Sequence, residues 1–240
     1  MHRHLGPLLH LIRTLPSMLL EITRVPGQLT RQEADWNALV KRIPQLIDYP
    51  LVSPTIEQHL RPAYNEYVSG VSSPLISLSL NRAAFCFLLS KAVGARKILD
   101  LGSGFSTYTF KRYCTEYTGD IISVDDSKQW LKITADFLAS HQLNTEGLMT
   151  LTDFINDKCL TRYPFDLCLL DIGDFSLRQQ LLPELINAAR MNNAVLVVDD
   201  FHVGAYRSFV FETCKKFGVH IYSARKYTRR RLSHAAVIIT

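Results

Sequence analysis

The chain has 240 residues, of which 47% are hydrophobic and 20% are charged, and its formal net charge is +5. This length predicts one large globular domain with a substantial core and room for a small appended subdomain. The modest charge excludes a protein that is basic throughout. Five widely spaced cysteines without a Cys-x-x-Cys pair argue against a disulfide framework and a zinc cluster, so we expect a cytoplasmic protein.

The first part of the chain predicts short helices that cover the rest of the molecule. Prolines break it into pieces before about residue 75, among them Pro44, Pro50, Pro54 and Pro62. We therefore expect a helical cap over residues 1–75 and a ligand-binding domain over residues 76–240.

The leucine-rich stretch 5–22 predicts neither a signal peptide nor a transmembrane segment. Pro7, Arg13, Pro16 and Glu21 interrupt it, and no apolar run approaches ~20 residues. Two interpretations stay open for this stretch: helices that cover the domain, or a surface for peripheral membrane contact or for a homodimer.

From residue 97 onward, strand-like and helix-like segments alternate, which predicts an α/β fold with a mostly parallel sheet covered on both faces. The last two strands are separated only by a loop, so we expect them to pair antiparallel. The expected strands are 97–101, 121–124, 148–151, 166–170, 194–198, 219–222 and 235–239. The expected helices are 77–93, 107–117, 128–141, 177–190 and 203–217.

The most informative stretch is 97–108, with the sequence Lys-Ile-Leu-Asp-Leu-Gly-Ser-Gly-Phe-Ser-Thr-Tyr. An apolar strand leads into Gly102 and Gly104, which permit positive φ and close backbone approach, and Ser106 or Thr107 is expected to cap the following helix. Backbone N–H groups at such a helix start attract electronegative ligands. A dinucleotide fingerprint anchored at Gly102 needs glycine at position 107, where this chain has threonine.

Asp100, the two glycines and an acid about twenty residues downstream resemble motif I of the class I S-adenosylmethionine-dependent methyltransferases, D/E-x-G-x-G-x-G. The chain departs from this motif at Ser106, where the last glycine usually stands. The resemblance covers roughly residues 75–240. It implies a Rossmann-like sheet of seven strands whose last strand is antiparallel, and S-adenosylmethionine as the cofactor.

The resemblance assigns cofactor contacts to residues that follow the strands. Asp125 is expected to accept hydrogen bonds from the ribose hydroxyls, although an acid that solvates a turn is the alternative. Trp130 either packs beside the adenosine or contacts the core. Asp153 either meets the adenine amino group, with Phe154 against the ring, or caps a short helix. The implied cofactor residues are Asp100, Gly102, Ser103, Gly104, Thr107, Asp125, Asp126, Trp130, Asp153, Phe154 and Asp171.

Asp171, Asp199 and Asp200 follow two expected strands and should gather at one edge of the sheet. The pattern is similar to the cation-dependent catechol-type O-methyltransferases, in which an acid and an Asp-Asn pair hold a divalent ion. That similarity implies Mg²⁺ on these three aspartates, with Asp200 departing from the usual asparagine. In the alternative, Asp171 approaches cofactor or substrate, and the other two cap a helix or bind substrate. His202, Asp171 and Asp199 are the candidate catalytic residues, with His202 as general base or as a structural histidine.

The favoured function is methyl transfer from S-adenosylmethionine to a hydroxyl oxygen of a small molecule, such as an aromatic or natural-product-like acceptor. A nucleic-acid methyltransferase that uses the basic cluster 225–231 is one alternative. Against it, Asp-Ile-Gly-Asp follows the fourth strand in place of the Asn-Pro-Pro-Tyr type of motif typical of base amine methylation. A cofactor-binding protein without methyl transfer, or a fold recruited to another reaction, is the other alternative.

Overall fold

A seven-stranded sheet organises the part of the chain that the computed structural model describes, residues 35–229 and 233–240. Its strand order is β3-β2-β1-β4-β5-β7-β6, and only the β5–β7 and β6–β7 pairs are antiparallel. The strands are β1 (Lys97–Leu101), β2 (Asp120–Asp125), β3 (Leu148–Thr150), β4 (Leu167–Leu170), β5 (Val195–Val198), β6 (His220–Ser223) and β7 (Ala236–Ile239). The expected Rossmann-like α/β fold is therefore confirmed.

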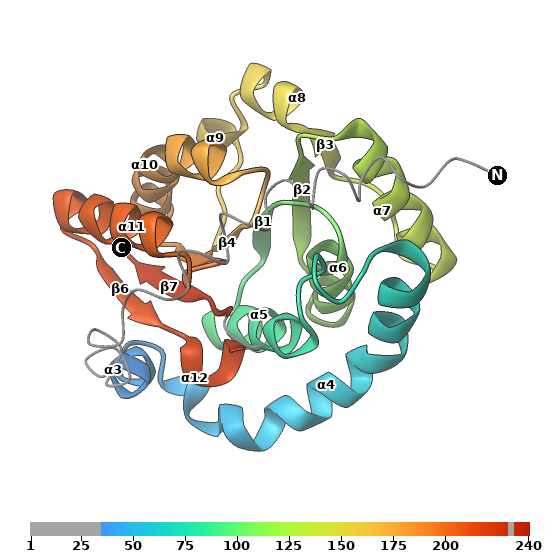
Figure 1. The fold of residues 1–240 in the computed structure, drawn as a ribbon, viewed down its shortest axis with the longest axis horizontal. Helices are drawn as coiled ribbons and strands as arrows, with labels where there is room; N and C mark the ends of the chain where they lie inside the picture. Colours follow the sequence, from blue (N-terminus) through green and yellow to red (C-terminus); the bar gives the residue numbers. More distant parts are fainter. Residues whose placement is uncertain (1–34, 230–232) are drawn as a thin grey trace.

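Helices cover both faces of the sheet (Figure 1). The first described helices are α3 (Asp35–Arg42), the 3₁₀ turn η1 (Pro44–Asp48), α4 (Tyr49–Glu66), the π-helical turn η2 (Tyr67–Val71) and α5 (Leu80–Val93). The described helices that follow β1 along the chain are α6 (Phe105–Tyr117), α7 (Lys128–Ser140), α8 (Leu151–Asn156), α9 (Cys159–Arg162), α10 (Phe175–Asn192), α11 (Gly204–Phe217) and α12 (Arg225–Thr228).

The strands are apolar on both faces because each face packs on helices. In β4, Leu167 and Leu169 belong to one hydrophobic cluster and Cys168 and Leu170 to the other, as the two-residue period of a strand requires. The first cluster contains side chains of α5, α6 and α7, and the second contains side chains of α10 and α11. Two cores thus hold the carboxyl ends of the parallel strands in fixed positions.

The helical cap differs from the expectation that prolines break it. A single helix, α4, runs through Pro50, Pro54 and Pro62 and follows a curved path around the molecule (Figure 1). Pro50 lies in the first turn, where a missing N–H costs nothing, and interior prolines bend a helix that is otherwise anchored by packing. The anchors here are the buried Tyr49 and Leu60.

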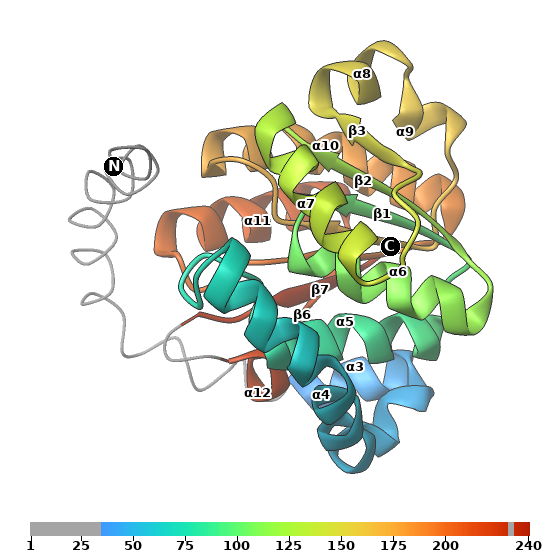
Figure 2. The same ribbon diagram turned by 90° about the vertical axis from the view of Figure 1, so that its right-hand side faces the viewer.

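The last two strands pair antiparallel as expected, but their connection is not a simple loop. The short helix α12 lies between β6 and β7, and Thr228 stabilises it by donating to the Ala224 carbonyl at 2.8 Å. Figure 2 shows α12 at the same end of the molecule as α3 and α4. Arg230, Arg231 and the stretch 5–22 lie outside the described residues.

No helix within residues 35–229 and 233–240 has the length and apolar composition that a membrane span requires.

Candidate active site

The glycine turn between β1 and α6 brings the chain into close contact with the end of β4. Gly102 has φ 111° and Gly104 has φ 145°, a region in which side chains are strained. A Cβ at Gly102 would lie 2.6 Å from the Asp171 carbonyl oxygen. The helix begins at Phe105, so Gly104 is its N-cap, and not Ser106 or Thr107 as expected.

Asp100 is fully buried beneath this turn and is the centre of a hydroxyl cluster. Its Oδ2 accepts hydrogen bonds from Ser106 at 3.1 Å, Thr107 at 2.8 Å and Ser123 at 3.0 Å. Its Oδ1 is buried without a hydrogen-bond partner in the described part of the chain. Burial raises the pKa of Asp100 to about 7, against the lowering effect of the three hydroxyls. An acceptor oxygen is therefore available directly under the glycine turn.

Ser106 and Thr107, the two positions at which the chain departs from glycine motifs, have defined roles in this cluster. Ser106 also donates to the Gly102 carbonyl at 3.0 Å, and Thr107 accepts from the Gly104 N–H at 3.0 Å. A glycine at either position would remove a hydroxyl that fixes the turn.

Asp125, at the end of β2, holds the same turn from the other side. Its Oδ2 accepts from the Ser103 N–H at 2.8 Å and the Ser103 hydroxyl at 2.9 Å, and its Oδ1 accepts from the Ser127 N–H at 2.9 Å. Burial raises the pKa of Asp125, and these hydrogen bonds act against the rise. The neighbouring Asp126 is exposed, and its Oδ2 lies 3.2 Å from where a Cβ at Gly173 would be.

Two aromatic side chains lie over the glycine turn. Trp130, in the first turn of α7, donates its indole N–H to the Ser103 carbonyl at 2.8 Å. The hydroxyl of the buried Tyr67 lies 2.8 Å from the position that a Cβ at Gly104 would take. Tyr67 comes from η2, within the expected cap, and no sequence motif surrounds it that would have predicted its place in the site. The cap thus contributes to the same site as the glycine turn.

The residues after β3 are arranged differently from the expectation. Thr150 is the N-cap of α8, accepting from the Asp153 N–H at 3.1 Å, while its own hydroxyl donates to the Asp153 carboxylate at 2.6 Å. Asp153 is therefore the third residue of the helix and not its cap. Phe154 is buried in the second hydrophobic cluster.

The three aspartates after β4 and β5 contact two arginines that no sequence motif predicted. Arg82 of α5 donates to both carboxylate oxygens of Asp199. Arg178 of α10 lies 2.9 Å from Asp171 Oδ1 and 3.2 Å from Asp200 Oδ2. Both guanidiniums and Asp199 are buried. The only sequence signal for them was a charged residue on an otherwise apolar helix face.

This geometry does not fit the expected metal site. Among the described residues, no group of three His, Cys, Asp or Glu side chains is arranged to hold a metal ion. Burial acts to raise the pKa of Asp199, but the contacts with Arg82 outweigh it and the pKa lies below its usual value. Burial raises the pKa of Asp171, and Arg178 opposes the rise.

Asp200 lies between the two arginines and beside His202. Its backbone has φ 53°, the left-handed region that non-glycine residues rarely adopt, and such strain clusters at functional sites. Asp200 Oδ1 accepts from the Ser233 hydroxyl at 3.3 Å and lies 3.7 Å from His202 Nδ1. Burial lowers the pKa of His202, although the nearby Asp200 acts in the opposite direction. A neutral imidazole beside a carboxylate can accept a proton.

Two further residues near the three aspartates, Asp174 and Tyr206, make contacts that stabilise the fold. Asp174 is the N-cap of α10 and accepts from the Leu177 N–H at 2.9 Å. Tyr206 is buried with its ring 5.0 Å from that of Phe175, and its hydroxyl has no hydrogen-bond partner in residues 35–229 and 233–240. The charges of Arg178 and of the acidic cluster, Asp171, Asp199 and Asp200, act on the pKa of Tyr206, so Tyr206 borders this cluster.

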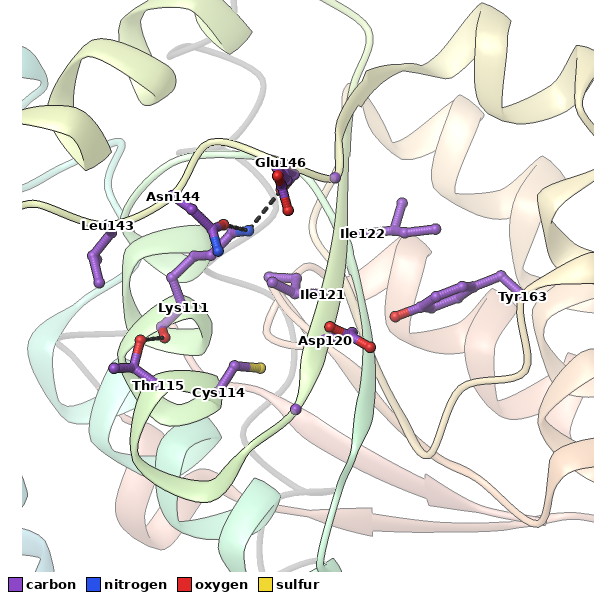
Figure 3. A pocket seen from close by; sticks show the side chains of 12 residues that line it. Lys111, Cys114, Thr115, Asp120, Ile121, Ile122, Leu143, Asn144, Glu146 and Tyr163 are labelled. Atoms are coloured by element: carbon purple, nitrogen blue, oxygen red, sulfur yellow. Dashed lines mark hydrogen bonds between the residues drawn. The ribbon is translucent and has the colours of Figure 1, made fainter.

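A separate cavity of about 330 Å³ lies at the opposite, amino-terminal end of β2 (Figure 3). Lys111 and Asp120 line it. The Lys111 ammonium is already bound to Asn144 Oδ1 and to the Glu146 carbonyl, each at 2.6 Å. This cavity contains no residue of the glycine turn or the acidic cluster.

Comparison with known proteins supports the fold assignment through structure and not through sequence. No protein-family model matches the chain, and no curated protein matches its sequence. The chain is similar to cofactor-bound Rv0187 from MTB, with a TM-score of 0.55 and 20% identity over 75% of this chain and 88% of that one. The O-methyltransferase TomG from Streptomyces achromogenes, in complex with SAM, has a TM-score of 0.54 and 17% identity over 75% and 89%.

An O-methyltransferase from Bacillus cereus in complex with SAH is similar over 78% of this chain and 91% of that one, with a TM-score of 0.55 and 16% identity. The fold of the chain is that of the class I S-adenosylmethionine-dependent methyltransferases.

Proposed function

We propose that the chain is a methyltransferase that binds S-adenosylmethionine at the glycine turn and methylates a hydroxyl oxygen of a small molecule. The observation that carries this proposal is the turn itself, with Gly102 and Gly104 at positive φ above the buried Asp100. The solved structures of the same fold include O-methyltransferases in complex with SAM or SAH.

The hydrogen-bond acceptors at the turn fit the chemistry of this cofactor. An unpaired buried acceptor costs about 1–3 kcal/mol, and a ligand ammonium would satisfy Asp100 Oδ1. Asp125 keeps acceptor capacity on Oδ1 for ribose hydroxyls, because a carboxylate oxygen can accept a second hydrogen bond. We assign the cofactor to Asp100, Gly102, Ser103, Gly104, Thr107, Asp125, Asp126 and Trp130, and we add Tyr67.

Asp153, Phe154 and Asp171 complete the proposed cofactor residues. Asp153 is exposed at the start of α8 and is free to present its second carboxylate oxygen to an adenine amino group. Phe154 supports this helix from the core, and Asp171 approaches the glycine turn through its backbone carbonyl.

We assign acceptor deprotonation to His202. S-adenosylmethionine held at the glycine turn would supply the methyl group to the acceptor oxygen and would leave as S-adenosylhomocysteine. His202 takes the hydroxyl proton, and its lowered pKa keeps it neutral and ready to do so at pH 7. Asp200, 3.7 Å away, stabilises the imidazolium that results. Asp171 and Asp199 act through their ion pairs, holding the strand ends that border the acceptor.

Calorimetric titration with S-adenosylhomocysteine tests cofactor binding, and tritiated S-adenosylmethionine with hydroxylated aromatic acceptors tests transfer. We expect saturable binding and a labelled ether product. Absence of binding by the folded protein would contradict the proposal, and binding without transfer to any acceptor would favour a non-methylating protein.

We further propose a cytoplasmic location, since the five cysteines are free thiols in the buried interior.

A further inference from the structure

The acidic cluster of Asp171, Asp199 and Asp200 contains its own cationic groups. Arg178 bridges two of the carboxylates, with Nη2 2.9 Å from Asp171 Oδ1 and Nη1 3.2 Å from Asp200 Oδ2. Arg82 binds Asp199, and its Nη1 also lies 4.0 Å from Asp200 Oδ1. Every carboxylate of the cluster thus has a guanidinium partner.

We propose that Arg82 and Arg178 take the place of a divalent cation in this cluster, so that the proposed methyl transfer proceeds without a metal ion. A guanidinium cannot be deprotonated in a protein, and a divalent ion bound to the same carboxylates would lie beside two fixed positive charges. This statement about the reaction rests on the proposed function, whereas the occupancy of the cluster by arginine does not.

Arg178 is held too firmly to move aside for an ion. Its Nε donates to the Ile172 carbonyl at 2.9 Å, and its Nη2 donates to the Asp171 carbonyl at 3.0 Å. Its side chain is only 8% exposed and lies against the ring of Phe175, 5.3 Å from the centroid. Rotation away from the cluster would leave two buried carbonyls without donors and two carboxylates without counter-charges.

Asp200 is the carboxylate that the two arginines share, with Oδ1 4.0 Å from Arg82 Nη1 and Oδ2 3.2 Å from Arg178 Nη1. Its Oδ1 also faces Ser233 and His202. The Asp200 carboxylate therefore lies beside the imidazole, where it opposes the effect of burial and favours uptake of a proton from the acceptor. Asp200 is in this way a positioning residue for His202.

Electron paramagnetic resonance with Mn²⁺ as the probe tests the inference on the whole chain. We expect no saturable Mn²⁺ binding by the wild-type protein, with or without S-adenosylhomocysteine. Arg178→Met removes the guanidinium but keeps a side chain of similar length, so this variant should bind Mn²⁺ and gain thermal stability from it. Arg61→Met is the matched control, because Arg61 pairs with Glu57 on the surface, and it should behave as wild type.

Saturable Mn²⁺ binding by the wild-type protein that is lost in Asp200→Asn would overturn the inference. So would full loss of methyl transfer in chelator with recovery in Mg²⁺. If Arg178→Met does not fold, the wild-type titration still decides the question. Failure of the proposed function has a different signature, since S-adenosylhomocysteine would then not bind whatever the Mn²⁺ result.

Discussion

Arg82 holds both carboxylate oxygens of Asp199, although 117 residues separate the two along the chain. Arg82 lies on α5, before the first strand of the sheet, and Asp199 follows β5. Both side chains are buried, and Arg82 also donates through Nε to the Ser79 hydroxyl at 3.1 Å. The pair therefore fixes the helix that precedes the glycine turn to the edge of the sheet at which the reaction is proposed.

Removing one partner of this ion pair should destabilise the fold strongly. Arg82→Met leaves Asp199 buried without a counter-charge, and we expect the free energy of unfolding to fall by about 3–5 kcal/mol. Urea denaturation measures the change. Arg61→Met, which breaks an exposed pair, should cost about 1 kcal/mol or less. Equal losses in the two variants would show that the buried pair has no special role.

Gly104 should be far less tolerant of substitution than Gly70. In Gly104→Ala the new methyl group would meet the Tyr67 hydroxyl at 2.8 Å on a backbone with φ 145°, so we expect a loss of about 1–3 kcal/mol in stability and weaker cofactor binding. Gly70 has open space around it, and Gly70→Ala serves as the control. The double variant Gly104→Ala with Tyr67→Phe should recover part of the loss, because the contact with the hydroxyl is gone. No recovery would assign the whole cost to the backbone.

Asp125→Ala should weaken S-adenosylhomocysteine binding by about tenfold to a hundredfold, the range expected for lost hydrogen bonds to a charged group. The variant also frees Ser103, whose N–H and hydroxyl both bind Asp125. Calorimetric titration gives the affinity, and Asp136→Ala, which removes an exposed carboxylate of α7, is the control. Unchanged affinity in Asp125→Ala would refute the ribose assignment.

Asp100 should give the fold a distinct pH dependence. Its ordinary pKa is 3.8, and burial raises it to about 7 in the folded protein. Between these values the folded state holds a proton that the unfolded state has lost, so stability should decrease as pH rises from about 4 to about 7. Asp100→Asn should flatten this decrease in denaturation curves taken across that range. A bound ligand ammonium should flatten it too, because it favours the ionised carboxylate.

His202→Gln should lower the rate of methyl transfer by about a hundredfold or more if His202 removes the acceptor proton. In the wild-type protein the rate should fall as His202 becomes protonated, at a pH below the ordinary pKa of 6.5, because burial lowers its pKa. The variant should lose this acid limb of the pH profile while it retains S-adenosylhomocysteine binding. An unchanged acid limb would exclude His202 as the base.

The sequence predicted the sheet well because each strand is a short apolar run with a turn at its end. All seven strands of the described chain lie within one or two residues of their expected bounds, and the antiparallel end of the sheet follows from the short connection before β7. The course of α4 could not be predicted in the same way. Local proline signals favoured breaks, but packing of Tyr49 and Leu60 in the core outweighed them.

The sequence predicted residues of the candidate site only where those residues belong to a motif. The glycine turn and Asp125 follow from spacing along the chain, and in the structure Asp125 accepts a hydrogen bond from the Ser103 N–H of that turn. The ribose contact of Asp125 stays a prediction. Arg82 and Tyr67 reach the site from helices before the first strand, and Arg178 reaches it from α10. No motif surrounds any of the three, and a charge on an apolar helix face was the only signal for the two arginines. The metal site was predicted from the three carboxylates alone. The two arginines that pair with these carboxylates are brought to them by the tertiary structure.

Tyr67 also bears on how the protein could be divided or shortened. Trp36 and Tyr49 pack against Tyr227 of α12 with ring centroids 4.3 and 4.5 Å away, and Tyr67 lies over the glycine turn. A fragment begun at residue 76 would retain all seven described strands, yet it would expose these apolar surfaces and lose Tyr67 from the glycine turn. We therefore expect residues 35–75 to be required for ligand retention as a fixed wall of the proposed site, and not to act as a removable cover.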